Sequence, residues 1–194
     1  MIRHFNLKLA DGIHLACRAA GVGRARVLLL HGFPEAAFVW DDVMLRVAPR
    51  AACVAPNLRG FTGSSAPTEV AAYRARHVVG DIVAAIEALG SPLDLLVAHD
   101  WGGALAWNLA AQRPDLLRRL LIINSPHPAT FLRELLHNPQ QQAASAYMNF
   151  LCRADAESLL AEGDFRRMWP FLQDASCRKC ENNIARPGPT KAVV

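Results

Sequence analysis

The feature that most constrains the fold is an alternation between short apolar runs and longer segments with helical periodicity. Apolar runs occupy residues 27–30, 51–55, 93–97 and 120–123, and only Asp94 interrupts them. A run of this length is typical of a strand that is buried on both faces of a sheet. Strands that alternate with helices predict an α/β fold: a mostly parallel sheet with helices on both faces.

The segments between these runs support the same fold. Residues 36–48, about 70–89 and 101–112 have the spacing of amphipathic helices, and Gly90 is a typical helix stop. Before the first run, residues 5–17 alternate between apolar and polar on either side of Asp11-Gly12, which predicts a β-hairpin.

Composition excludes several classes of protein. The chain has 194 residues, of which 52% are hydrophobic and 20% charged, which fits one globular core with a small appended subdomain. No window approaches the roughly 18 consecutive apolar residues of a membrane span, and the start has no signal-peptide core. The net charge of +4 comes from basic residues scattered along the sequence. We therefore expect a soluble cytoplasmic protein with neither a nucleic acid nor a membrane as partner.

The cysteines give no sign of a disulfide framework or a metal site. There are five, an odd number, as is common for reduced thiols in the cytosol. Cys177 and Cys180 form a Cys-x-x-Cys pair, but no further pair follows to complete a zinc site. We expect no metal and no cofactor.

The residues with the clearest chemistry lie where the third of these runs ends. Leu96 to Gly103 reads as a strand that turns sharply into a helix, with small residues at 98, 102 and 103. Such a turn holds one side chain out over the carboxyl edge of the sheet, and here that side chain is Asp100. A carboxylate there can attack an electrophilic carbon and form an ester. The alternative is that Asp100 only caps the following helix.

A second motif follows the run at residues 27–30. His31-Gly32-Phe33-Pro34 would lie at the same edge of the sheet as Asp100, because the carboxyl ends of parallel strands meet there. The backbone N–H groups of Phe33 and Trp101 are therefore candidates for an oxyanion hole.

At these positions the chain resembles the α/β-hydrolase superfamily and, within it, the soluble epoxide hydrolases. The resemblance covers about residues 3–170. His31, Gly32, Pro34, His99 and Gly102 support it as motif residues. The four motifs, in the order of the family, are His31-Gly32-Phe33-Pro34, residues 59–64, residues 99–103 and residues 124–128.

The resemblance implies a division into domains and a reaction. It implies a core over residues 1–127, a partial helical cap over residues 128–174 and an irregular tail over residues 175–194. It also implies that Asp100 opens a small-molecule epoxide to form an ester, and that a cap tyrosine, for which Tyr147 is the candidate, hydrogen-bonds the ring oxygen. Tyr147 could instead be an ordinary residue of an amphipathic helix.

Two departures from the family make activity an open question. Catalytic histidines of this superfamily follow the aspartate late in the chain, whereas the last histidine here is His137, and no apolar strand run follows Ile123. We therefore expect a C-terminally truncated, impaired hydrolase whose strand at residues 120–123 is an uncovered edge. The alternatives are a non-catalytic remnant or ligand-binding pseudoenzyme, and a hydrolase similar to haloalkane dehalogenases, although Phe33 stands where those carry a polar halide ligand. The sequence does not assign an oligomeric state.

Overall fold

The structure is a computed structural model that describes residues 1–168. It divides into two compact units, the first from Met1 to Phe131 and the second beginning at Leu132. The expected irregular tail at residues 175–194 lies outside the described residues.

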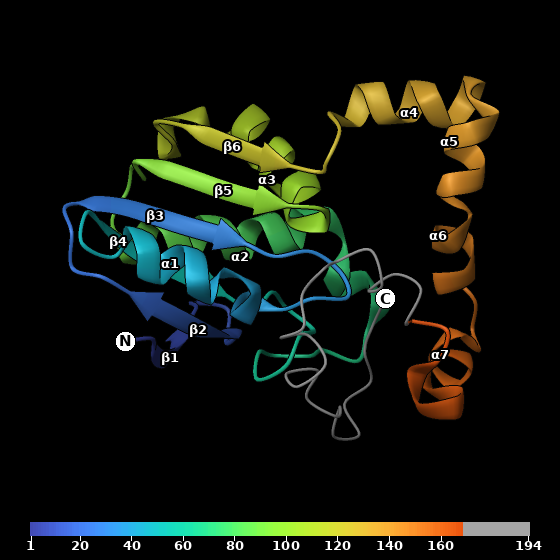
Figure 1. The fold of residues 1–194 in the computed structure, drawn as a ribbon, viewed down its shortest axis with the longest axis horizontal. Coiled ribbons are helices and arrows are strands. Elements are labelled where there is room, and N and C mark those ends of the chain that lie inside the picture. The colour runs from blue at the N-terminus through green and yellow to red at the C-terminus, as the bar shows by residue number, and fades with distance from the viewer. Residues whose placement is uncertain (169–194) are drawn as a thin grey trace. The chain divides into compact units, whose positions relative to one another are not determined.

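A six-stranded sheet forms the centre of the first unit (Figure 1). Its strand order is β1-β2-β4-β3-β5-β6, and β2 is antiparallel to both of its neighbours. The pairs β4–β3, β3–β5 and β5–β6 are parallel, which confirms the predicted mostly parallel α/β sheet. The strands are β1 (Arg3–Lys8), β2 (His14–Ala20), β3 (Ala25–Leu30), β4 (Ala51–Pro56), β5 (Leu95–His99) and β6 (Leu120–Ile123).

Helices lie on both faces of this sheet, as the alternating pattern predicts. Trp40 and Met44 pack with Leu29 and Val97 on the face covered by α1. On the other face α2 and α3 bury the larger cluster, which includes Leu30 and Leu96. The elements are η1 (Ala37–Trp40), α1 (Asp41–Val47), η2 (Val70–Tyr73), α2 (Ala75–Leu89), α3 (Trp101–Gln112) and η3 (Pro114–Leu116).

The helix expected over residues 70–89 is two elements rather than one. Arg74 has φ −56° and ψ 142°, which is extended rather than helical, so η2 ends before it and α2 begins after it. Within α2 the buried side chains include Val78, Ile82 and Ile86, at helical spacing along one face.

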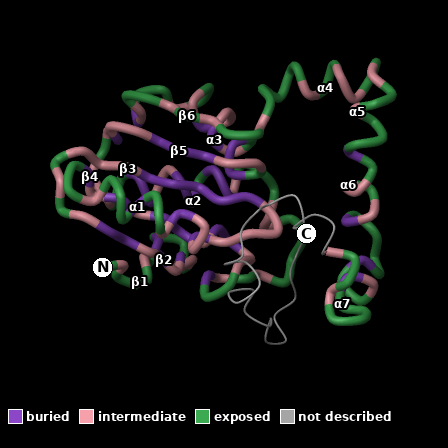
Figure 2. The backbone as a smooth tube through the Cα atoms, viewed as in Figure 1, coloured by how far each residue is buried: buried purple, intermediate pink, exposed green. Residues whose placement is uncertain are grey.

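Burial follows the position of each strand in the sheet. Figure 2 shows the second half of β3 and the centre of β5 as buried, because each has a strand on both sides and helices above and below. In the part of the chain that the structure describes, β6 pairs only with β5, and Leu121 and Ile123 remain exposed. The sequence predicted this uncovered edge.

The second unit is helical. It contains most of α4 (Pro128–His137), then α5 (Pro139–Ala144), α6 (Ala146–Leu151) and α7 (Ala156–Phe165). The side chain of Asn138 caps α5 by accepting hydrogen bonds from two backbone N–H groups. Across residues 1–168, none of the helices has the length and apolar character needed to cross a bilayer.

Candidate active site

The turn between β5 and α3 holds Asp100 in an unusual backbone conformation. Asp100 has φ 52° and ψ −120°, a region that L-residues seldom adopt. Its N–H donates to the carbonyl of Ile123 at 3.1 Å, and its carbonyl accepts from the N–H of Ala104 at 3.1 Å. The backbone of Asp100 is therefore tied both to the end of β6 and to the first turn of α3.

The carboxylate of Asp100 does not cap α3. It occupies the N-cap position, but it makes no capping hydrogen bond. Instead Oδ1 accepts a hydrogen bond from the backbone N–H of Phe33 at 3.0 Å. The capping alternative is therefore wrong, and the side chain points to the loop after β3.

Three glycines allow the backbones to approach this closely. A Cβ atom at Gly32 would lie 2.4 Å from Oδ1 of Asp100, and one at Gly102 would lie 2.5 Å from the carbonyl oxygen of His31. A Cβ atom at Gly103 would lie 2.4 Å from Cβ of Ser125, in the segment after β6. The small residues around Asp100 are thus required by contacts with β3, β6 and their loops.

The loop after β3 places a backbone donor beside the carboxylate and an aromatic ring near that of Trp101. Phe33 supplies the N–H group, and the Phe33–Pro34 peptide bond is cis. The rings of Phe33 and Trp101 lie 6.4 Å apart, centroid to centroid, and Trp101 is 41% exposed. Trp101 is the first residue of α3, so its N–H lies at the positive end of the helix dipole.

His31 is a structural residue. It is fully buried, its Nδ1 donates to the carbonyl of Gly32 at 2.8 Å, and its Nε2 accepts from the N–H of Leu58 at 3.1 Å. Burial lowers the pKa of His31 to about 4, so the ring is neutral near pH 7. Both nitrogens are occupied, so His31 joins the loops after β3 and β4 and is not available as a general base.

A histidine–carboxylate pair that no sequence motif indicates lies next to the turn between β5 and α3, which we call the elbow. Nδ1 of His99 is 3.3 Å from Oε2 of Glu35, and both side chains are partly exposed. The hydrogen bond with Glu35 raises the pKa of His99, and the Asp100 carboxylate acts in the same direction. Glu35 directly follows the His-Gly-Phe-Pro motif, but nothing in the sequence pairs it with a residue so far along the chain.

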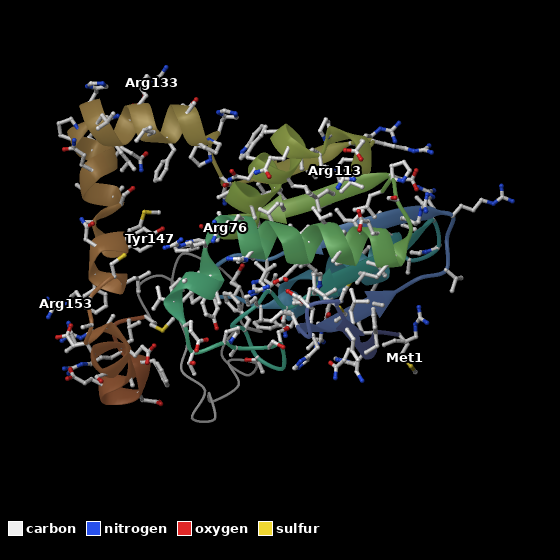
Figure 3. The ribbon with its side chains drawn as sticks, turned by 180° about the vertical axis from the view of Figure 1, so that it is seen from behind. Met1, Arg76, Arg113, Arg133, Tyr147 and Arg153 are labelled. Carbon is white, nitrogen blue, oxygen red and sulfur yellow. The ribbon has the colours of Figure 1, made fainter. Side chains whose placement is uncertain are left out.

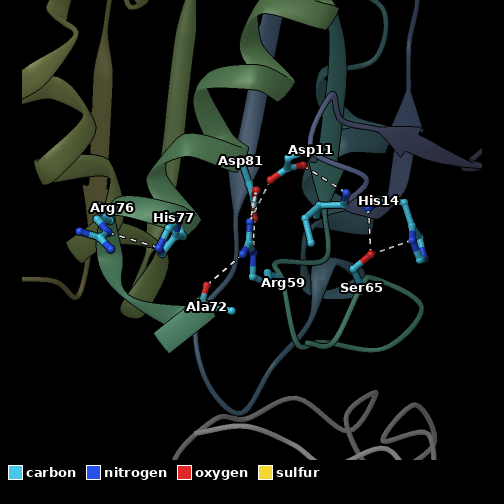
Figure 4. Close-up of polar contacts among 9 residues, drawn as sticks. Asp11, His14, Arg59, Ser65, Ala72, Arg76, His77 and Asp81 are labelled. Atoms are coloured by element: carbon cyan, nitrogen blue, oxygen red, sulfur yellow. Dashed lines mark hydrogen bonds and ion pairs between the residues drawn. The ribbon is translucent and has the colours of Figure 1, made fainter. Parts of the chain in front are cut away.

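The glycine-rich loop after β4 is anchored by a buried ion pair (Figure 4). Arg59 donates to Asp81 on α2 through Nε at 2.7 Å and Nη2 at 2.6 Å, and to the carbonyl of Ala72 at 2.9 Å. Nearby, Ser65 bonds both the backbone and the ring of His14 on β2. The loop that supplies Leu58 to His31 is therefore fixed from both sides.

The remaining predicted residue lies in the second unit. Tyr147 is half-buried on α6, and its role toward a substrate stays a prediction. After β6, the indole of Trp107 donates to the carbonyl of Ser125 at 3.2 Å and packs against His127. Residues 1–168 contain no group of three histidine, cysteine or carboxylate side chains that could hold a metal ion.

Comparison with known proteins gives the same fold. Residues 25–180 match the family described as alpha/beta hydrolase fold. The chain is 36% identical over 178 residues to epoxide hydrolase 3 of Xenopus tropicalis, an alignment that covers 90% of this chain and 48% of that protein. The chain therefore spans about half the length of this curated relative.

Solved structures of epoxide hydrolases superpose on the chain. An epoxide hydrolase from Bacillus megaterium, solved with an inhibitor, matches with a TM-score of 0.82 and 32% identity, over 88% of this chain and 60% of that one. A metagenomic epoxide hydrolase from a hot environment matches with a TM-score of 0.78 and 37% identity, over 84% of this chain and 55% of that one.

Proposed function

This chain belongs to the α/β-hydrolase fold family, and we propose that it opens small epoxides by attack of the Asp100 carboxylate. The observation that carries the proposal is the 3.0 Å hydrogen bond from the Phe33 N–H to Oδ1, in a turn that holds the carboxylate away from the helix it precedes. The similarity to epoxide hydrolases supports the choice of substrate.

The hydrogen bond supports different roles for the two carboxylate oxygens. Oδ1 accepts from Phe33, so it becomes the carbonyl oxygen of the ester, and Oδ2 is the attacking atom. A lone pair of Oδ2 forms a bond to a ring carbon while the C–O bond of that carbon breaks and its electrons pass to the ring oxygen. The product is a hydroxyalkyl ester of Asp100 once the ring oxygen has taken a proton.

The reaction also needs a proton donor for the ring oxygen and a surface that binds the carbon substituent of the epoxide. We assign proton donation to Tyr147, because the resemblance predicts a tyrosine of the cap in that role. The rings of Phe33 and Trp101 beside Asp100 favour an epoxide with an apolar substituent.

Hydrolysis of the ester needs a base that activates water. His31 is buried and neutral with both nitrogens occupied, and the 194 residues contain no histidine after His137. His99 lies beside Asp100, but Glu35 raises its pKa and so favours the protonated form, which cannot act as the base. We therefore propose that these 194 residues form the ester but release it slowly, so that one epoxide is consumed per chain.

Intact-mass spectrometry after incubation with styrene oxide tests both steps. We expect one added epoxide mass per chain, stable over hours, and no adduct in Asp100→Asn. Asp115→Asn is the matched control, because Asp115 is an exposed aspartate that pairs with Arg113, away from the elbow.

Each result has a definite meaning. With the free thiols, such as exposed Cys152, blocked beforehand, an adduct that persists in Asp100→Asn would rule out Asp100 as the nucleophile. No adduct on the unmodified chain would favour a non-catalytic protein. Formation of diol over many turnovers, lost in Asp100→Asn, would support the nucleophile but disprove the arrest at the ester.

A further inference from the structure

The amino ends of the parallel strands, at the opposite end of the strands from Asp100, carry arginines that are far apart in the sequence. Asp100 follows β5, at the carboxyl ends of the parallel strands, whereas Arg24, Arg50 and Arg119 each immediately precede a strand, at the amino ends. Parallel pairing aligns β4, β3, β5 and β6, so these positions lie along one edge. We call Val22, Arg24, Arg26, Arg50, Arg118 and Arg119 the amino-end edge.

Backbone contacts bring these segments together. A Cβ atom at Gly23 would lie 2.1 Å from the carbonyl carbon of Arg50, so the turn before β3 packs directly on the segment before β4. The N–H of Arg26 donates to Asp94 at 2.8 Å, and Asp94 is 3.7 Å from a guanidinium nitrogen of Arg118. Neighbouring strands are about 4.8 Å apart, so the whole edge spans only a few strand spacings.

Most of this positive charge is not neutralised within the protein. Arg24, Arg50 and Arg119 are exposed, and in residues 1–168 none of them has an ion pair within 4.0 Å. Arg26 differs from them, because its guanidinium donates to the carbonyl of Gly90 at the end of α2. Two carboxylates lie in the segments that lead into β3, β4, β5 and β6: Asp94, beside Arg26 and Arg118, and Asp115, which pairs with Arg113.

An apolar side chain projects from the same edge. Val22 is 92% exposed in the turn between Gly21 and Gly23, beside Arg24. Val47, at the end of α1, is also exposed and lies three residues before Arg50. Exposed apolar side chains surrounded by arginines combine the two features that hold peripheral proteins at a bilayer surface.

We propose that the amino-end edge docks this protein on an anionic phospholipid surface, with Val22 entering the interface and the arginines contacting the headgroups. A nucleic acid fits the edge less well, because an exposed valine gains nothing from phosphates and these segments present no aromatic side chain for base stacking. Docking at the amino ends leaves Asp100, at the carboxyl ends, free to meet its substrate.

The sequence alone predicted no membrane partner, because it contains no spanning segment and its basic residues are scattered along the chain. A peripheral docking surface differs from that expectation, since it depends on how the strands are arranged. The pairing of parallel strands brings together arginines that are far apart in the sequence.

The layer formed by α2 and α3 supplies a control residue far from these arginines. Figure 3 shows Arg113, after α3, and Arg76, in the first turn of α2, at opposite ends of this layer. Arg76 therefore offers a control that changes charge away from the amino-end edge.

Co-sedimentation with vesicles tests the proposal on the 194-residue chain. We expect binding to phosphatidylserine–phosphatidylcholine vesicles at about 0.1 M salt, loss of binding at about 1 M salt and little binding to phosphatidylcholine alone. Arg24→Glu with Arg119→Glu should lower the partition coefficient at least about tenfold. The matched control, Arg74→Glu with Arg76→Glu, changes the charge equally and should bind much as the unmodified chain does.

A second pair of variants separates insertion from simple charge attraction. Val22→Asp should weaken vesicle binding, whereas Val70→Asp, at a 75% exposed valine on η2, should not. Circular dichroism of each variant checks that the fold is retained. Equal binding by both double variants, no binding to the anionic vesicles, or tighter salt-sensitive binding to duplex DNA than to vesicles would overturn the proposal.

Discussion

β5 and β6 are neighbouring strands with similar sequences and very different surroundings. Both are short apolar runs, and they pair in parallel so that Leu96 lies beside Leu120 and Val97 beside Leu121. Leu96 is fully buried, whereas Leu121 is 48% exposed. The two leucines thus differ by position in the sheet rather than by their own chemistry.

An apolar run therefore predicts a strand more reliably than it predicts the burial of that strand. β5 has β3 on one side, β6 on the other and helices on both faces. On β6, Leu120 and Ile122 pack against the cluster covered by α3, but the side chains that alternate with them face outward. A strand with one neighbour and one covered face leaves half of its apolar residues in water.

The largest predicted effect compares one leucine in each strand. Leu96→Ala should lower the free energy of unfolding by about 2–5 kcal/mol, because it opens a cavity in the larger core cluster. Leu121→Ala should lower it by less than about 1 kcal/mol, since that side chain is already half in water. Urea denaturation followed by circular dichroism measures both.

Equal losses of stability in the two variants would contradict this prediction. If Leu121→Ala destabilised the chain as much as Leu96→Ala, β6 would have to be covered in solution by something that the described residues do not include.

The next effect concerns the contact that joins the ends of the two strands. Gly103→Ala would place a methyl group 2.4 Å from Cβ of Ser125, so it should destabilise the chain by about 1–3 kcal/mol. Gly80→Ala is the matched control, because Gly80 also lies in a helix but has open space around its Cβ position. It should stabilise the chain by about 0.5–1 kcal/mol.

A double variant then tests the reason for that loss. Ser125→Gly in the Gly103→Ala background removes Cβ of residue 125, the atom that the new methyl group would meet, so it should recover part of the stability. No recovery would mean that a different contact, such as the one at 3.3 Å with Cγ2 of Ile122 on β6, makes the alanine unfavourable.

Sequence patterns predicted the parts of the fold that depend on neighbours along the chain. The strands, the elbow at Asp100 and the donor at Phe33 follow from local runs of residues, because each is read from a few consecutive positions. The resemblance to the hydrolase family was read from the same short motifs, and the comparisons bear it out.

What the sequence did not predict depends on contacts between distant segments. Nothing local pairs Glu35 with His99, and the arginines of the amino-end edge become neighbours only when parallel strands align. The break at Arg74 was also missed, because the apolar spacing continues through it while its backbone is extended. These features follow from topology rather than from periodicity.

Buried His31 and partly exposed His99 should make the stability of the chain depend on pH in opposite directions. Burial lowers the pKa of His31 to about 4 from 6.5, so below pH 6.5 the unfolded chain binds a proton that the folded chain does not. The contribution of neutral His31 is therefore complete above about pH 6.5 and is lost as the pH falls toward 4. Between pH 7 and 5.5 we expect a loss of about 1 kcal/mol, which His31→Gln should remove.

The His31 prediction can be checked without a variant. Titration of the ring by NMR should show no protonation near pH 6. Protonation of His31 near its ordinary pKa would contradict the inference that burial keeps it neutral.

His99, at the end of β5, should show the opposite and smaller dependence on pH. Glu35 raises the pKa of His99, so the folded chain binds this proton more tightly than the unfolded chain does. The contribution of the pair is therefore complete below about pH 6.5 and is lost as the pH rises through the raised pKa. Because both side chains are partly exposed, we expect Glu35→Gln to cost less than about 1 kcal/mol at pH 6 and still less at pH 9.

Glu69→Gln provides the control for the Glu35 variant, because Glu69 is exposed and lies outside the elbow. Its effect on unfolding in urea should be close to zero at both pH values. A loss in Glu35→Gln that is equal at pH 6 and pH 9 would mean that Glu35 acts through packing rather than through charged His99. The raised pKa would then not describe the residue beside Asp100, and the half-buried end of β5 would depend on packing, as its buried centre does.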